Sequence, residues 1–167
     1  MIARKKLNTR YRLLWILFTL TFSCNSNLEF IDYNSLDGSW HKDSIQEFSF
    51  ELIGAESDSF NSYINLRLND NYIFNNIFMI VKLRDTSQTI SIDTLQFRIA
   101  DKSGNFLGKK GINIIDYSLP HKENLNFDSN KKYIVSVEHA MRVINKTDGL
   151  QKLDGIEDVG FKILKIN

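Results

Sequence analysis

Alternation of apolar and polar residues recurs along this chain and constrains its fold more than any other feature. In one segment Phe48, Phe50 and Leu52 share one face, while Glu47 and Ser49 lie on the other. Successive side chains of a strand point to opposite faces, so this pattern predicts strands with one buried face. The same pattern occurs in five segments: 46–52, 63–68, 94–99, 133–138 and 159–163.

Three further segments lack this clean alternation. The nearly all-apolar run 77–83 predicts a strand that is covered on both faces or lies near an edge of the core. Residues 112–119 give a weaker strand prediction, and 150–155 are the best candidate for a short helix or 3₁₀ turn. Turn-forming residues separate the segments, at 68–71, 84–87, 101–104, 128–130 and 147–149.

Seven or eight short strands spaced by turns predict an all-β fold. We expect an antiparallel, jelly-roll-like β-sandwich with one core between two sheets. A closed barrel is the alternative.

The N-terminus has the organisation of an export signal. Residues 1–12 hold five basic residues and no acidic one, and an apolar run follows at 13–22. That run is shorter than the roughly 20 apolar residues of a spanning helix. Cys24 follows directly and is the only cysteine, so it has no internal disulfide partner. We therefore expect lipidation of Cys24; an ordinary secretory signal and an uncleaved anchor are the alternatives.

These features predict three parts of the chain. Residues 1–23 form a lipoprotein signal peptide, 24–43 are the lipidated cysteine with a tether, and 44–167 are the β-sandwich domain. The mature protein is then held at a membrane by its lipid. Asn25 follows Cys24 where an inner-membrane retention signal would have Asp, so the prediction is an outer-membrane lipoprotein facing the periplasm.

The charge balance excludes one class of partner. Without residues 1–23, the 21 basic and 20 acidic residues of the chain become 16 and 20. No basic cluster occurs in this acidic remainder, so a nucleic-acid partner is not expected.

The sequence offers no catalytic, cofactor or metal-binding motif. The histidines, His41, His121 and His139, lack the spacing of metal ligands. Residues 101–105 are typical of a glycine-bearing turn rather than of a calcium loop. The sequence therefore offers no candidate catalytic residue, cofactor or metal ligand.

Two features leave a functional alternative open. Trp40 is expected to pack at one end of the core, although an exposed tryptophan would suit a sugar ring. Ser44 and Thr94 each lie in an Asp-Ser/Thr-aliphatic triplet, which is a candidate O-glycosylation motif.

Several stretches of the chain share a pattern with one known family. They include Leu36–Trp40, Leu66–Asn69 with Tyr72, Asp93–Leu95, Ala100-Asp101 with Gly104 and 106–109, Tyr133–Arg142 and Leu153–Gly160. On these residues the chain resembles the gliding-motility lipoprotein GldH family of Bacteroidota. The resemblance implies a non-enzymatic, lipid-anchored component of the cell envelope that is needed for gliding and acts beside other proteins of the gliding apparatus.

The resemblance also suggests where partners bind. Residues 66–77, 104–109 and 141–160 are the expected interaction surface. The alternative function is a glycan-binding envelope lipoprotein, which requires a row of exposed aromatic side chains on one sheet face.

Overall fold

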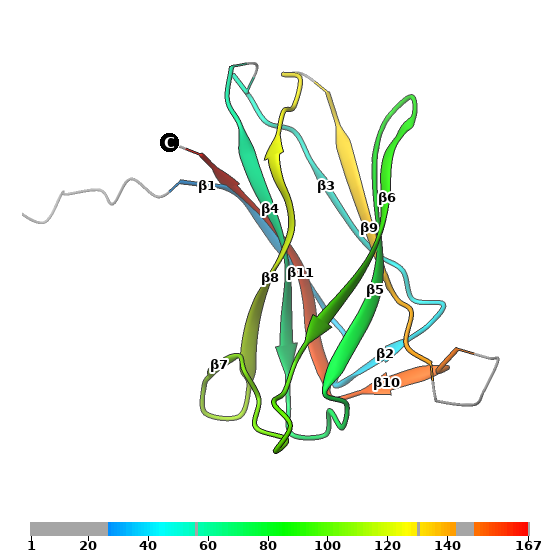
Figure 1. Ribbon diagram of the computed structural model, residues 1–167. Coiled ribbons are helices and arrows are strands. Elements are labelled where there is room, and N and C mark those ends of the chain that lie inside the picture. Colours follow the sequence, from blue (N-terminus) through cyan, green and yellow to red (C-terminus); the bar gives the residue numbers. More distant parts are fainter. Residues whose placement is uncertain (1–26, 56, 130, 143–148, 167) are drawn as a thin grey trace, which may run out of the picture.

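The computed structural model describes residues 27–55, 57–129, 131–142 and 149–166 (Figure 1). Every regular element in these ranges is a strand, and all pairings are antiparallel, which confirms the predicted all-β fold. The strands are β1 (Leu28–Ser35), β2 (Ser39–His41), β3 (Gln46–Phe50), β4 (Phe60–Leu68), β5 (Asn76–Asp85), β6 (Thr89–Arg98), β7 (Lys109–Lys110), β8 (Ile115–Leu125), β9 (Tyr133–His139), β10 (Lys152–Asp154) and β11 (Ile156–Lys165).

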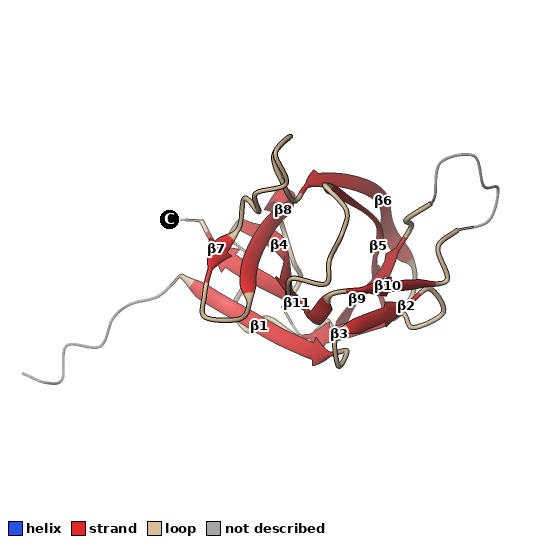
Figure 2. Cartoon of the chain, turned by 90° about the horizontal axis from the view of Figure 1, so that it is seen from below, coloured by secondary structure: helices blue, strands red, loops and turns tan. Residues whose placement is uncertain are grey.

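Two sheets face each other across the core (Figure 2). One has the order β1-β11-β4-β8-β7, the other β3-β9-β5-β6, and β2 pairs with β10 in a separate ribbon. Each large sheet interleaves strands from both halves of the chain, which is the jelly-roll arrangement.

The core lies where the alternating faces of both sheets meet. β9 alternates buried and half-buried residues along its whole length, and β3 alternates buried and exposed ones. Phe48 and Phe50 of β3 stack on Phe161 of β11, with ring centroids 6.3 and 5.8 Å apart. Burying one such side chain contributes about 1.5–3 kcal/mol, so these contacts join the two sheets.

β5 differs from the prediction of a strand covered on both faces. Its odd-numbered residues are buried, whereas Phe78, Ile80 and Lys82 on the other face are only half-buried. No second layer covers this outer face within the described part of the chain. The apolar run therefore reflects one core face and one partly apolar surface.

β1 differs from the predicted tether. Residues 28–35 pair with β11 in the five-stranded sheet, so the sandwich begins at Leu28 rather than at residue 44. A bulge between Leu28 and Phe30 breaks the period, and apolar groups face both ways. Phe30 packs on Phe50 and Phe161, while Tyr33 lies on the outer face, so no clean alternation remains in the sequence.

Residues 150–155 also differ from the predicted short helix. They contain β10, which pairs with β2 and is followed by a turn at Gly155. A three-residue strand is too short for its period to be visible in a sequence.

The sandwich has two ends, which we name by their position relative to β1. The proximal end, where β1 begins, holds Leu28, the loop 51–59, the turn 86–88, the described part of 126–132 and Ile166. The distal end holds 36–45, 69–75, 99–114 and the described part of 140–155 (Figure 1). Among the residues that the structure describes, no helix is long and apolar enough to cross a membrane.

Candidate functional site at the distal end

The distal end is built around the ribbon of β2 and β10. Trp40 lies opposite Leu153, and both are fully buried. The Trp40 indole Nε1 donates to the Ser44 carbonyl at 2.7 Å, and its ring meets the His139 ring edge-on at 5.4 Å. Trp40 therefore packs at one end of the core, as predicted, and it is not a platform for a sugar ring.

Gly155 holds the next loop against this ribbon. Its φ of +85° is in the left-handed region, and an added Cβ would lie 2.2 Å from the backbone nitrogen of Tyr72. The Gly155 N–H donates to the Gly38 carbonyl at 2.8 Å, and its own carbonyl accepts from the Asn69 N–H at 3.0 Å. The loop 69–75 is thus fixed to the turn after β10, and that turn is bonded to the residue before β2.

Side chains complete this arrangement. Asn69 donates through Nδ2 to Glu157, whose backbone carbonyl accepts from the Leu36 N–H at 2.8 Å. The Tyr72 hydroxyl donates to the Asn76 carbonyl at 2.7 Å, and burial raises the pKa of Tyr72 well above its ordinary value. Tyr72 therefore stays neutral and keeps this donor near neutral pH.

The predicted interaction segments gather at this end of the molecule. Most of 66–77, all of 104–109 and the described part of 141–155 lie there, whereas 156–160 run up β11. A cavity of about 330 Å³ opens among Gly104, Phe106 and Lys110. A shallow cavity of about 470 Å³ lies on the outer face of the four-stranded sheet, between Phe78 and Arg142. The distal end therefore offers two concave regions on a well-packed base.

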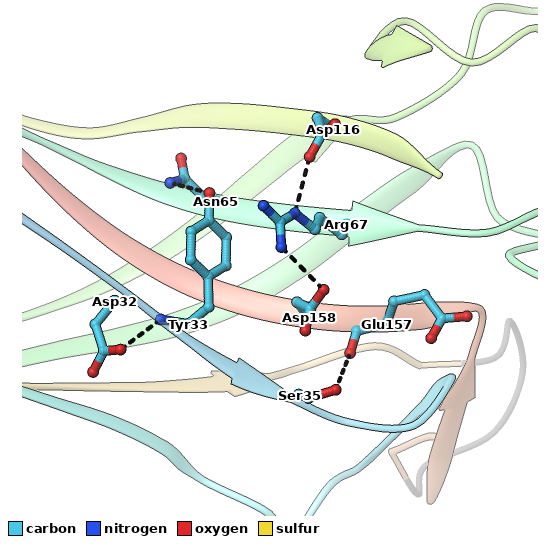
Figure 3. A network of polar contacts seen from close by, with 8 residues as sticks. All are labelled: Asp32, Tyr33, Ser35, Asn65, Arg67, Asp116, Glu157 and Asp158. Carbon is cyan, nitrogen blue, oxygen red and sulfur yellow. Dashed lines mark hydrogen bonds and ion pairs between the residues drawn. The ribbon is translucent and has the colours of Figure 1, made fainter. Parts of the chain in front are cut away.

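The outer face of the five-stranded sheet carries a polar network (Figure 3). Arg67 bonds to Asp116 at 3.1 Å and Asp158 at 3.5 Å, and its guanidinium lies 4.3 Å above the Tyr33 ring. The Tyr33 hydroxyl accepts from Asn65 Nδ2 at 3.0 Å. The two aspartates neutralise Arg67, so the network leaves little free charge for a ligand, although the buried Asn65 Oδ1 has no hydrogen-bond partner among the described residues.

Gly160 explains why Tyr33 lies flat on that face. The two residues are paired across β1 and β11, and a Cβ at Gly160 would lie 2.6 Å from the Tyr33 ring. The aromatic ring covers the strand where the glycine has no side chain, which is a known way to stabilise a glycine within a sheet.

A Ser–His–Asp cluster bridges the two sheets, which no sequence spacing indicated. Ser62 Oγ lies 3.0 Å from His121 Nδ1, and His121 Nε2 lies 3.3 Å from Asp93 Oδ2. The His121 side chain is 0% exposed and Ser62 is 1% exposed, so only the Asp93 end meets solvent. A nucleophile must reach its substrate, so this geometry suits a structural bridge rather than acyl transfer.

The charges in this cluster fit that structural role. Burial lowers the pKa of His121 despite the nearby Asp93. Partial burial opposes ionisation of Asp93, but hydrogen bonds from Lys122, Ser91 and His121 lower its pKa overall. A neutral His121 that donates from Nε2 to Asp93 and accepts at Nδ1 from Ser62 satisfies all three groups.

Other predicted site residues are placed as follows. Cys24 and the signal peptide lie outside the described residues. Thr94 is exposed on β6, whereas Ser44 is half-buried and its Oγ accepts from Gln46 Nε2 at 2.8 Å. The described ranges contain no cluster of three or more residues suited to a metal ion.

The described residues lack the surface that glycan binding requires. Every aromatic side chain in these ranges is buried or half-buried. On the outer face of the five-stranded sheet, Arg67 covers Tyr33 and Lys162 covers Tyr63. No row of exposed aromatic rings therefore occurs in the described ranges.

Comparison with known proteins identifies the family. The GldH lipoprotein family model matches residues 29–163. The gliding motility lipoprotein GldH of Flavobacterium johnsoniae is 37% identical over 144 residues, 86% of this chain and 89% of the relative. A gliding motility lipoprotein GldH homolog of Christiangramia forsetii is 35% identical over 143 residues, 86% of this chain and 87% of the relative.

Likeness to solved structures is low. The insecticidal delta-endotoxin Cry8Ea1 of Bacillus thuringiensis aligns with a TM-score of 0.41 and 12% identity, over 81% of this chain and 20% of the toxin chain. The assignment therefore depends on the sequence relatives. With a family model matched from residue 29 to 163, this chain belongs to the GldH lipoprotein family.

Proposed function

We propose that this protein is a non-enzymatic, lipid-anchored component of the cell envelope that is required for gliding motility. The observation that carries the proposal is the match to the GldH lipoprotein family over residues 29–163. Relatives that cover nearly the same length are named gliding motility lipoproteins. The anchor is the acylated sulfur of Cys24, since a lipoprotein of this sequence has no other cysteine to modify.

The proposed location is the outer membrane, with the domain facing the periplasm. Asn25 at the position after Cys24 supports this choice over retention at the inner membrane. Stable attachment requires two or more acyl chains, because one chain gives only marginal membrane binding.

The distal end is the proposed contact surface for other proteins of the gliding apparatus. Three observations support it: the family-like segments gather there, the base is well packed and hydrogen-bonded, and large apolar side chains are exposed on it. Ile73, Leu107 and Ile112 are 81, 56 and 98% exposed. Exposed apolar groups that stand on a well-packed base are typical of interaction sites.

The non-enzymatic role is supported by the Ser62–His121–Asp93 bridge. This is the one arrangement among the described residues that has the connectivity of a nucleophile and its base, and its serine is inaccessible. Ser62→Ala should therefore reduce motility only as far as it reduces the amount of folded protein.

The test is complementation of a deletion strain, scored by surface spreading. Ile73→Lys with Leu107→Lys at the distal end is expected to abolish spreading and the co-purification of envelope proteins. The control is Ile90→Lys, the same apolar-to-lysine change at an exposed site on β6, which should leave both intact. The proposed surface fails if both variants spread normally. The proposed function fails if the deletion strain itself spreads.

A further inference from the structure

We propose that the proximal end of the sandwich rests on the bilayer surface and that Ile53 enters the boundary between headgroups and acyl chains. The partner is thus the lipid surface itself. The contact does not depend on recognition of a particular headgroup. The inference rests on the proposed acylation of Cys24.

The reach of the chain restricts the domain to the membrane. β1 begins at Leu28, four residues after Cys24. Four residues span at most about 14 Å when fully extended. The ten residues of β5 cover about 33 Å, so the distal end lies much farther from the attachment point than the proximal end. An acylated Cys24 must therefore keep the corner of the sandwich that holds Leu28 within about 14 Å of the lipid.

An apolar side chain is held out into solvent at this end. Ile53 is 96% exposed, although its neighbours Leu52 and Ala55 are buried. The Ala55 N–H donates to Ser129 Oγ at 3.0 Å, which fixes the loop to the adjacent strand connection. The loop therefore presents Ile53 outward, and Leu28 and Ile166 add two partly exposed apolar side chains at the same end.

Charged side chains at the proximal end neither oppose nor drive its contact with the bilayer. Lys165 pairs with Asp58 at 2.7 Å and Lys131 pairs with Asp128 at 2.5 Å, so two of the three lysines at the proximal end are neutralised by their neighbours, and Lys132 is the third. Binding should thus depend little on anionic lipid or on salt.

A sideways orientation is disfavoured by the surface next to β1. The outer face of the five-stranded sheet, to which β1 belongs, carries Arg67, Asp116, Asp158 and Lys162. Charged groups are poorly placed against acyl chains. The partly apolar outer face of the four-stranded sheet lies on the opposite side of the sandwich from β1.

The chain provides a matched pair for the test. Ile53 and Ile112 are 96 and 98% exposed but lie at the proximal and distal ends. Ile53→Trp and Ile112→Trp are prepared as full-length lipidated proteins in phosphatidylcholine vesicles whose acyl chains carry bromine, a short-range quencher. Trp40, buried at the distal end, gives a constant background that the wild-type protein measures.

The added fluorescence of Ile53→Trp is expected to be quenched at least twofold, and that of Ile112→Trp to be unchanged. Equal quenching of both would indicate a sideways orientation and overturn the proposal, as would quenching of neither in vesicles that carry the protein on flotation. The Cys24→Ser variant is the reference that should not float with the vesicles. If the wild-type protein also fails to float, both the proposed anchor and the proposed orientation on the membrane are overturned.

Discussion

At the residue scale, two glycines of the last family-like stretch are required for different reasons. Gly155 needs a left-handed backbone and a space that the Tyr72 main chain already fills. Gly160 lies within β11, and there the Tyr33 side chain fills the space. A Cβ at Gly155 would meet backbone atoms, which cannot move aside, in a left-handed conformation. A Cβ at Gly160 would meet the Tyr33 ring, which can rotate away, and the Asp32 carbonyl oxygen at 2.8 Å.

Gly155→Ala should be among the most destabilising single changes in the domain. A Cβ 2.2 Å from the Tyr72 nitrogen and 2.5 Å from its Cα forces the loop 69–75 off the ribbon. We expect a loss of at least about 3 kcal/mol in urea unfolding, beyond the range of most point substitutions. Gly104→Ala is the control, since φ is +84° there but no atom lies within 4 Å, so only about 1–2 kcal/mol of backbone strain is expected. Similar losses in the two variants would contradict the steric argument.

The two buried histidines should make the fold sensitive to mild acid. Burial lowers the pKa of both His121 and His139, and the His139 ring nitrogens have no hydrogen-bond partner among the described residues. The unfolded chain then binds more protons than the folded one as pH falls below about 6.5. Stability is therefore complete above this pH and decreases below it.

Urea unfolding between pH 7.5 and 5 measures this effect. We expect the free energy of unfolding to fall below about pH 6.5, by at most about 1.4 kcal/mol per pH unit for each histidine that remains neutral in the folded state. His139→Phe keeps an aromatic ring against Trp40 but removes one of the two titrating groups. It should therefore remove the contribution of His139 to the slope of the unfolding free energy against pH. Despite partial burial, hydrogen bonds lower the pKa of Asp93, the carboxylate next to His121, so its titration lies in a separate and lower range. A flat profile between pH 7.5 and 5 would show that folding lowers the pKa of neither histidine.

At the scale of elements, β1 is the part of the fold that would join the proposed anchor to the core. It covers β11 at the sheet edge, and it supplies Phe30 to the aromatic cluster of the core and Tyr33 to the outer face. Residues 36–41 then cross to the distal ribbon, where Trp40 is fully buried. The segment that reads as a tether in the sequence is thus a structural part of the sandwich.

A fragment that begins at residue 44 should therefore fail to fold. It loses Phe30 and Trp40, leaves the edge of β11 unpaired and removes the Gly38 carbonyl that Gly155 requires. We expect poor amide dispersion in its NMR spectrum, whereas a fragment that begins at Asn25 should give a dispersed spectrum. Cooperative unfolding of the shorter fragment would show that β1 and β2 are dispensable.

The sequence predicts a strand wherever one face of the strand points to the core and the other points to solvent. The strands at 46–52, 63–68, 94–99, 133–138 and 159–163 correspond to β3, β4, β6, β9 and β11 for that reason. It fails at β1, where a bulge shifts the period, and at β10, which is too short to show one. The Ser62–His121–Asp93 bridge joins residues from three strands, so only the folded topology brings it together.

At the distal end, the sequence predicts the segments but not the way they meet. The residues of the family-like segments could be named from the sequence, because they are local runs. Their meeting could not, since it depends on the pairing of β2 with β10 and on backbone contacts between Gly38, Gly155 and Asn69. Backbone hydrogen bonds between distant turns leave no periodic signal in the side chains.

At the scale of the whole molecule, the two ends have opposite roles in the proposed function. The short chain between Cys24 and β1 holds the proximal end at the lipid, and the length of the sandwich then sets the height of the distal end at about 33 Å or more above it. A partner that contacts Ile73 and Leu107 must meet the protein at that height. Tether length is therefore as much a part of the proposed function as the distal residues.

A flexible spacer tests this relation between anchor and contact surface. Inserting 15 Gly/Ser residues between Ser26 and Asn27 adds a mean reach of about 20 Å without touching any described contact. We expect the variant to fold and remain in the membrane fraction, but to spread less than wild type, because the distal end is no longer held at one height. The control replaces residues 25–27 by Gly and Ser without changing the length, and it should spread normally. Full spreading with the long spacer would mean that the anchor only concentrates the protein at the membrane and that its height is irrelevant.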